Sequence, residues 1–180
     1  MNALTLSGSI RKGSYNRLLQ RDVSERLRRR GVAVTELDLA DYPLPVFSED
    51  IEVEGMPDAA VELGRLFVAA DIVFIASPEY NAGLTPLLVN TLDWVSRQKG
   101  RPFRHAVFGL GGVSSGKLST VVGLSHLRDM LTKVMALTAA IDIRVGPGEE
   151  AFDTQGQLID ETAITRAELL ADELIRLAAK

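Results

Sequence analysis

Short apolar segments alternate along this chain with longer amphipathic ones, and this alternation is the feature that most restricts its fold. The run Ile72–Ala76 is entirely apolar, which is typical of a strand buried on both faces of a sheet. Similar runs predict four further strands, at Ala3–Leu6, Val32–Leu37, His105–Leu110 and Ile141–Val145. Apolar residues at helical spacing predict helices over Asn16–Arg30, Ala59–Ala70, Thr85–Arg97, Leu118–Ala139 and Thr162–Ala179.

Strands that alternate with helices favour a parallel sheet covered by helices on both faces. Five strands and five helices in 180 residues fit an α/β flavodoxin-like doubly wound sheet with strand order 2-1-3-4-5. We expect residues 1–180 to form a single domain, because no linker, repeat or low-complexity segment divides them. Two prolines and several acidic residues predict a loop at 42–56.

The composition excludes several kinds of site and partner. The chain has no cysteine, which excludes disulfides and cysteine-ligated metals and fits a reducing cytoplasm. His105 and His126 lack the spacing of metal ligands, so we expect no metal site. The net charge of −4 argues against a nucleic-acid partner. The sequence shows neither a signal peptide nor an apolar stretch of the ~18 residues that span a membrane, so we expect a cytoplasmic protein without membrane insertion.

Ligands of doubly wound sheets bind beyond the carboxyl ends of the strands. Three loops should meet there in this chain, at 8–16, 77–83 and 111–116. The loop 8–16 leads into a predicted helix, whose N-terminus offers free N–H groups and partial positive charge. We predict that this loop binds an anion, because its side chains add further donors, namely Ser9, Arg11, Ser14 and Asn16.

The anion is expected to be a phosphate monoester. A dinucleotide-binding loop needs G-x-G-x-x-G and an acid about 20 residues further on. This loop has only Gly8 and Gly13, so Asp38 is interpreted as an ordinary acid at a strand end. The alternative is a solvated loop in which Ser14 or Asn16 caps the helix, which accounts for those two residues but not for the whole donor set.

The loop 77–83 is a candidate seat for a flat heterocycle, because a rigid proline, an aromatic ring and a glycine follow the best strand. Its candidate residues are Pro78, Glu79, Tyr80, Asn81 and Gly83. The alternative is an ordinary tight turn. We do not expect Glu79 to act as a general base, since no histidine or other partner lies near it in the sequence.

The loop 111–116 is rich in glycine, and Gly111, Gly112 and Ser114 are candidates for a wall that a ring can approach closely. With Lys117 it reproduces the G-x-x-x-x-G-K spacing of a P-loop. Leu118 stands where a P-loop needs a Ser or Thr to bind Mg²⁺, so we reject a nucleoside triphosphatase.

Several motifs resemble those of the NAD(P)H-dependent FMN reductases. The segment Gly8–Asn16 is similar to that family's phosphate loop. Ser77–Asn81 followed by Asn90–Arg97 resembles its S-P-E-Y-N…N-x-(I/L)-D-W-x-S-R signature. Two shorter segments are also similar, His126–Arg128 and Phe152–Asp160. The chain departs from the family pattern at Val89, where many members have Lys, and at Gly109–Gly112, where many have Ser or Thr.

The resemblance implies an FMN site. The phosphate would be held by Ser9, Arg11, Ser14, Tyr15 and Asn16. The isoalloxazine ring would be lined by Pro78, Glu79, Tyr80 and Asn81. The resemblance also implies a homodimer or homotetramer, and a small-molecule acceptor such as a quinone, a free flavin, chromate or an azo dye.

We therefore predict an FMN-dependent oxidoreductase with NADPH or NADH as electron donor. Hydride would pass to N5 of bound FMN and the electrons then to the acceptor, with ping-pong kinetics. No catalytic side chain is required, and Tyr80 is expected to border the substrate face. The alternative is a flavodoxin-type electron carrier without NAD(P)H oxidation. Arg11 and the mild net charge count against that carrier, because flavodoxins tend to be more acidic and have Thr-rich phosphate loops.

Overall fold

Five parallel strands form the central sheet of the computed structural model, which describes residues 1–116 and 120–179. The strand order is β2-β1-β3-β4-β5, as the alternation predicts. The strand bounds are β1 Asn2–Ser7, β2 Ala33–Leu37, β3 Ile72–Ala76, β4 Val107–Val113 and β5 Leu137–Val145. The register places Ala3 beside Ile72, and Ile72 beside Val107.

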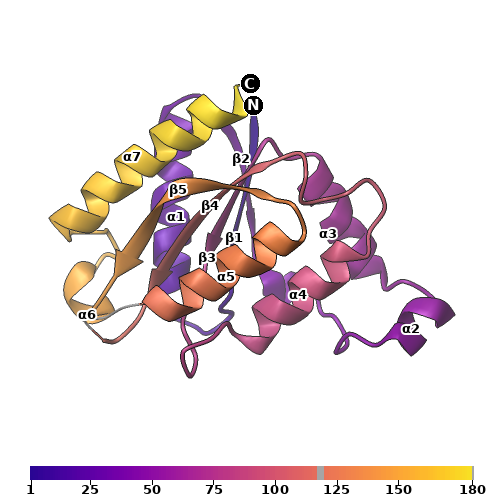
Figure 1. The fold of residues 1–180 in the computed structure, drawn as a ribbon. Helices are drawn as coiled ribbons and strands as arrows, with labels where there is room; N and C mark the ends of the chain where they lie inside the picture. Colours follow the sequence, from indigo (N-terminus) through magenta and orange to yellow (C-terminus); the bar gives the residue numbers. More distant parts are fainter. Residues whose placement is uncertain (117–119, 180) are drawn as a thin grey trace.

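The helices cover both faces of the sheet (Figure 1). Their bounds are α1 Tyr15–Arg29, α2 Glu49–Glu54, α3 Asp58–Val68, α4 Pro86–Ser96, α5 Val121–Lys133, α6 Gly148–Ala151 and α7 Glu161–Ala178. Helices α1 and α7 pack on one face, and α3, α4 and α5 pack on the other. The predicted doubly wound flavodoxin-like fold is thus confirmed.

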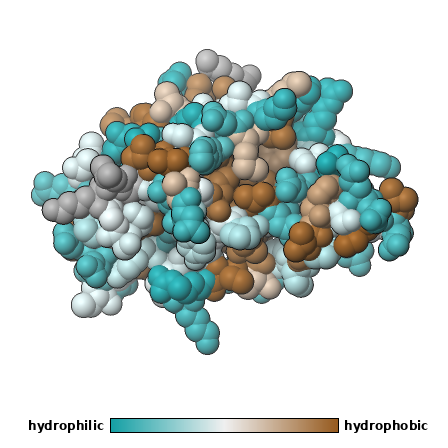
Figure 2. All heavy atoms as spheres, turned by 60° about the horizontal axis from the view of Figure 1, so that its bottom comes forward, coloured by the Kyte–Doolittle hydropathy of each residue, from teal (hydrophilic) through white to brown (hydrophobic). Residues whose placement is uncertain are grey.

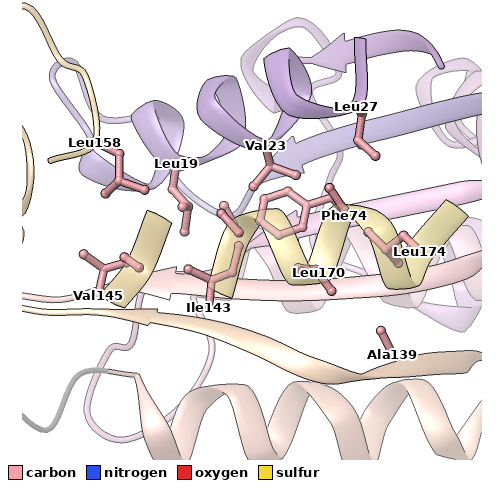
Figure 3. Close-up of a cluster of buried hydrophobic side chains, with 14 of the residues drawn as sticks. Leu19, Val23, Leu27, Phe74, Ala139, Ile143, Val145, Leu158, Leu170 and Leu174 are labelled. Atoms are coloured by element: carbon pink, nitrogen blue, oxygen red, sulfur yellow. The ribbon is translucent and has the colours of Figure 1, made fainter. Parts of the chain in front are cut away.

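The core between the sheet and helices α1 and α7 explains why these two helices form where they do. Leu19, Val23 and Leu27 recur at every fourth position of α1 and are fully buried. Figure 3 shows them facing Phe74 of β3 and Leu170 of α7. Burial of such side chains contributes about 1.5–3 kcal/mol each, so this stripe fixes how α1 lies on the sheet.

One predicted boundary is wrong: the helix expected over 118–139 ends much earlier. Helix α5 ends at Lys133, and Met135 adopts a positive φ of 63°. The N–H of Ala136 donates to the carbonyl of Leu131 over 2.9 Å, which closes the helix. Strand β5 then starts at Leu137 rather than at Ile141, because Leu137 and Thr138 pair with Val107 and Phe108 of β4.

Two short helices were not predicted. Helix α2 lies in the segment expected to be a loop at 42–56, and none of its residues is buried. Helix α6 follows β5 directly and spans Gly148–Ala151. Strand β4 also continues beyond its predicted end at Leu110 to Val113. Helices without a buried face leave no periodic signal in a sequence, which explains why α2 was missed.

Among residues 1–116 and 120–179, no helix has the length and apolar character needed to cross a bilayer.

Adjacent leucines on α7 test the packing of the core. Leu170 is fully buried whereas Leu169 is 52% exposed. We expect Leu170→Ala to lower the free energy of unfolding by about 2–5 kcal/mol, because the substitution leaves a cavity against the sheet. Leu169→Ala is the matched control and should change the value by less than about 0.5 kcal/mol. Urea unfolding of both variants checks this, and equal losses would contradict the packing described here.

Candidate functional site

A pocket of about 300 Å³ opens beyond the carboxyl ends of the strands. It is lined by nine of the predicted site residues, namely Ser9, Arg11, Ser14, Tyr15, Asn16, Pro78, Glu79, Tyr80 and Ser114. Figure 2 turns the lower end of Figure 1 forward and shows separate hydrophobic patches among hydrophilic side chains. The structure therefore brings residues from the three predicted loops into one pocket.

The N-terminus of α1 supplies the donors of this pocket. Ser14 is the residue before the helix, and its side chain makes no capping hydrogen bond. In the described part of the chain, the backbone N–H groups of Tyr15 and Asn16 also have no acceptor. Arg11 lines the same pocket. Free N–H groups, a helix dipole and a guanidinium together favour an anion such as phosphate.

The loop 8–16 is held in place by contacts of Gly8 with β3 and with the start of α4. Thr85 donates from its hydroxyl to the carbonyl of Gly8 over 2.7 Å, and the Gly8 N–H donates to Ala76 over 2.9 Å. A Cβ on Gly8 would lie 3.2 Å from Cβ of Leu88, so a larger residue here would require Leu88 to shift by a few tenths of an ångström. The loop thus starts from a fixed position at the end of β1.

Asn16 joins the end of the loop 8–16 to β4. Its Nδ2 donates to the carbonyl of Val113, and its Oδ1 accepts from the Val113 N–H, both over 2.9 Å. The residue is only 4% exposed. The Asn16 side chain is therefore committed to the protein, and the group that it leaves to the pocket is its backbone N–H.

Glu79 connects the loop 77–83 to α5. Its Oε2 accepts from the N–H of Gly123, in the first turn of that helix, over 2.7 Å. A Cβ on Gly123 would lie 3.2 Å from Cγ of Glu79, so the two segments touch closely. A carboxylate at this position is stabilised by the positive end of the α5 dipole. Glu79 is therefore engaged in a structural contact with α5.

The comparisons with known proteins agree with this geometry. A family model described as NADPH-dependent FMN reductase matches residues 1–143. The chain belongs to this family. An NAD(P)H-dependent FMN reductase of Pseudomonas aeruginosa is 33% identical over 166 residues, which cover 91% of this chain and 87% of that protein. A quinone reductase of Escherichia coli is 31% identical over 165 residues, covering 89% and 86% of the two chains.

The solved structure of FerB, a flavoenzyme NAD(P)H:(acceptor) oxidoreductase from Paracoccus denitrificans, superposes with a TM-score of 0.82. At 21% identity, with 99% and 97% of the two chains covered, it supports the fold. Membership of the FMN reductase family makes this chain an oxidoreductase with FMN as cofactor and NAD(P)H as electron donor.

Four predicted site residues of this FMN reductase do not line the pocket. Asn81 and Gly83 belong to a tight turn, in which the N–H groups of Tyr80 and Gly83 each donate to the other's carbonyl. Gly111 and Gly112 lie inside β4 rather than in the loop after it. A Cβ would lie 3.0 Å from the Phe74 ring at the first and 2.4 Å from the Ser77 carbonyl oxygen at the second. These two glycines therefore permit close packing around the site, in place of the predicted wall.

The segment after β5 contributes to the pocket and was missed. Gly148 and Glu149 line it, with Val113 and Ser115. The Gly148 N–H donates to the carbonyl of Ser114 over 2.9 Å, and a Cβ on Gly148 would lie 2.9 Å from the Tyr15 ring. The Gly-Pro-Gly sequence at 146–148 directly after a strand was the available signal, because such residues mark turns at the ligand-binding edge.

The other residues singled out in the sequence lie elsewhere. Asp38 pairs with Arg17 over 2.6 Å, as an ordinary strand-end acid would. Trp94 is fully buried and donates from Nε1 to the carbonyl of Pro45 over 2.8 Å. Burial raises the pKa of its neighbour Asp93, and the charge of Arg97 partly opposes that shift. Lys117 and Leu118 lie outside the described residues.

The contact between Glu79 and α5 can be tested by two substitutions. Glu79→Ala removes both the charge and the acceptor for Gly123, and we expect it to lower the free energy of unfolding by about 1–2 kcal/mol. Glu79→Gln keeps an oxygen acceptor and should lose roughly half as much. Urea unfolding of the two variants beside the wild type measures both values, and wild-type stability of Glu79→Ala would show that the contact contributes nothing.

Proposed function

We propose that the pocket at the N-terminus of α1 holds the FMN phosphate. The observation that carries this proposal is the set of open backbone N–H groups of Tyr15 and Asn16 beside Arg11. Ser9 and Ser14 line the same pocket and add hydroxyl donors. A dianionic phosphate monoester needs many donors around one point, and this is the donor set that the loop supplies.

The isoalloxazine ring is proposed to lie against the turn that follows β3. Pro78, Glu79 and Tyr80 line this part of the pocket, and Ser114 lines it from the loop after β4. Asn81 and Gly83 shape the turn without lining the pocket. Tyr80 is 52% exposed, so its ring can border the face that a substrate reaches.

FMN held in this pocket would supply the redox chemistry, namely acceptance of a hydride from NADPH or NADH and transfer of electrons to the acceptor. The chain's own residues bind and orient the reactants, and no side-chain acid or base is assigned to the hydride step. Donor and acceptor are proposed to occupy the same face in turn, with ping-pong kinetics. The proposed acceptors are a quinone, a free flavin, chromate or an azo compound, in keeping with the relatives named above.

The chain is proposed to act as a single domain in a cytoplasmic homodimer or homotetramer. Apolar side chains near the pocket support an association or acceptor surface there. Val121 and Val122, next to the Gly123 contact of Glu79, are 39% and 43% exposed.

Membership of the FMN reductase family disfavours the alternative of a flavodoxin-type carrier. Arg11 at the pocket and the net charge of only −4 favour the reductase over the carrier.

Reduction of the flavin by a nicotinamide donor tests the proposed function. Protein purified with FMN should lose nearly all of its flavin absorbance when about one equivalent of NADPH or NADH is mixed with it anaerobically in a stopped-flow instrument. Admission of a quinone should then restore the absorbance. Flavin that stays oxidised with both donors, but is reduced by dithionite, would favour the carrier.

The role of Arg11 can be tested through cofactor affinity. We expect Arg11→Ala to weaken FMN binding about 10- to 100-fold, because a charge-assisted contact of roughly 1.5–3 kcal/mol is lost. Riboflavin, which lacks the phosphate, should bind both proteins equally weakly. Arg176 is exposed on α7, and Arg176→Ala is the control that should keep wild-type affinity. Fluorescence titration of the apoprotein measures the constants, and an unchanged Kd for FMN in Arg11→Ala would remove Arg11 from the phosphate site.

A further inference from the structure

Glu149 is a carboxylate of the pocket to which the proposed function assigns no role. It lies in the four-residue helix α6 and lines the pocket together with Arg11 and Ser14. The residue is exposed. No cation forms an ion pair with Glu149 in the part of the chain that the structure describes. Its negative charge is therefore not neutralised by any of the described side chains.

Helix α6 is held against the start of α1, which is the end of the pocket proposed for the phosphate. Gly148 directly precedes Glu149, and a Cβ on Gly148 would lie 2.9 Å from Cδ2 of the Tyr15 ring. The same ring stacks on Phe152, just after α6, with 5.7 Å between the ring centroids. Tyr15 is the first residue of α1. These contacts on either side of Glu149 therefore place it at the phosphate end of the pocket.

The balance of charged side chains in the pocket is unfavourable for a dianion. The described lining residues include one cation, Arg11, and two carboxylates, Glu79 and Glu149. Glu79 accepts from the N–H of Gly123 over 2.7 Å, so the positive end of α5 compensates part of its charge. Helix α6 has only four residues, and its dipole is correspondingly small. Glu149 is thus the carboxylate whose charge remains to act on a bound phosphate.

A carboxylate near a bound phosphate raises the Kd of the ligand through repulsion. Two negative groups about 8 Å apart at a water-filled rim repel strongly enough to change a Kd roughly three- to tenfold at low ionic strength. The repulsion acts on the phosphate and not on the uncharged ring system of a flavin. Salt weakens it, because the Debye length falls to about 3 Å at 1 M.

We propose that Glu149 opposes the FMN phosphate and so keeps FMN exchangeable between the protein and the solution. The inference rests on the proposed function, because it requires the phosphate to lie at the start of α1. The open N–H groups and Arg11 attract the phosphate, Glu149 repels it, and the Kd for FMN reflects the difference. Glu149 is thus a specificity-determining residue that reduces the preference of the pocket for FMN over riboflavin.

Fluorescence titration of the apoprotein with FMN tests this role. Glu149→Gln keeps the shape of the side chain and removes its charge, so we expect it to lower the Kd for FMN about three- to tenfold at low salt. Glu149→Lys reverses the charge and should lower the Kd further. Glu150→Gln is the matched control, because this adjacent acid of α6 is exposed and is not a lining residue of the pocket. It should change the Kd by less than about twofold. Riboflavin should bind all four proteins alike.

Salt separates repulsion from a change in the shape of the pocket. In about 1 M salt, the Kd values of the wild type and of Glu149→Gln for FMN should converge, because the interaction is then screened. A difference that persists undiminished at this salt concentration would overturn the proposal. A Kd for FMN that is unchanged in Glu149→Gln at low salt would also overturn it. So would weaker binding of both FMN and riboflavin, which would show that Glu149 accepts hydrogen bonds from the ribityl chain instead.

The variant Arg11→Ala distinguishes a failure of this inference from a failure of the proposed function. If Arg11→Ala weakens FMN binding and Glu149→Gln leaves it unchanged, the phosphate lies at the start of α1 and Glu149 has no part in its affinity. If neither substitution changes the Kd for FMN, the phosphate lies elsewhere and both proposals are wrong.

Discussion

The two hydrogen bonds between the buried amide of Asn16 and the backbone of Val113 are the contact on which the arrangement of the site depends. They hold the first turn of α1 against the end of β4. The loop 8–16 and the loop after β4 therefore stay at a fixed distance from each other. Val113 is also the last residue of its strand, and the next residue, Ser114, receives the N–H of Gly148 from the segment after β5. Both polar atoms of the Asn16 amide are used. Removal of this side chain would therefore leave the N–H and the carbonyl of Val113 without partners, at a cost of about 1–3 kcal/mol each.

The other side of the pocket is fixed by contacts of the same kind. Thr85 binds the carbonyl of Gly8 and also accepts from the N–H of Leu88 at the start of α4. The Thr85 hydroxyl thereby caps α4 and also anchors the loop 8–16. Glu79 anchors the loop 77–83, because its carboxylate accepts from the Gly123 N–H in the first turn of α5. The two loops are thus held at helix N-termini, one by the Thr85 hydroxyl at the start of α4 and the other by the Gly123 N–H in α5.

Much of this fold could be predicted because its signals are local. The apolar run Ile72–Ala76 gave the bounds of β3 correctly, and the stripe of α1 marked its buried face. The junction of α5 and β5 could not be predicted, because alanines at 139 and 140 suit a helix, whereas Leu137 and Thr138 just before them pair with Val107 and Phe108 of β4. The pairing of Asn16 with Val113 spans 97 residues and leaves no mark in the local pattern.

Nine of the predicted site residues line one pocket, and the glycines of β4 illustrate why other predicted residues do not. Arg11 and Ser14 line the pocket, and they could be predicted because the hydrogen-bond donors of their side chains are visible in the sequence. Gly111 and Gly112 were assigned to a ligand wall, yet their missing side chains make room for Phe74 and for the Ser77 carbonyl. A glycine next to a site is ambiguous in a sequence, since close approach of a ligand and close approach of the protein itself demand the same absence of a Cβ.

The charges around the pocket follow from these structural contacts. Glu79 and Glu149 place two carboxylates at a site that is assigned to a phosphate. The first is turned to the positive end of α5, so part of its charge is compensated there. Arg11 and the start of α1 place positive charge at the same pocket. The proposed phosphate position therefore lies where the positive groups of the pocket gather, beside Arg11 and the start of α1.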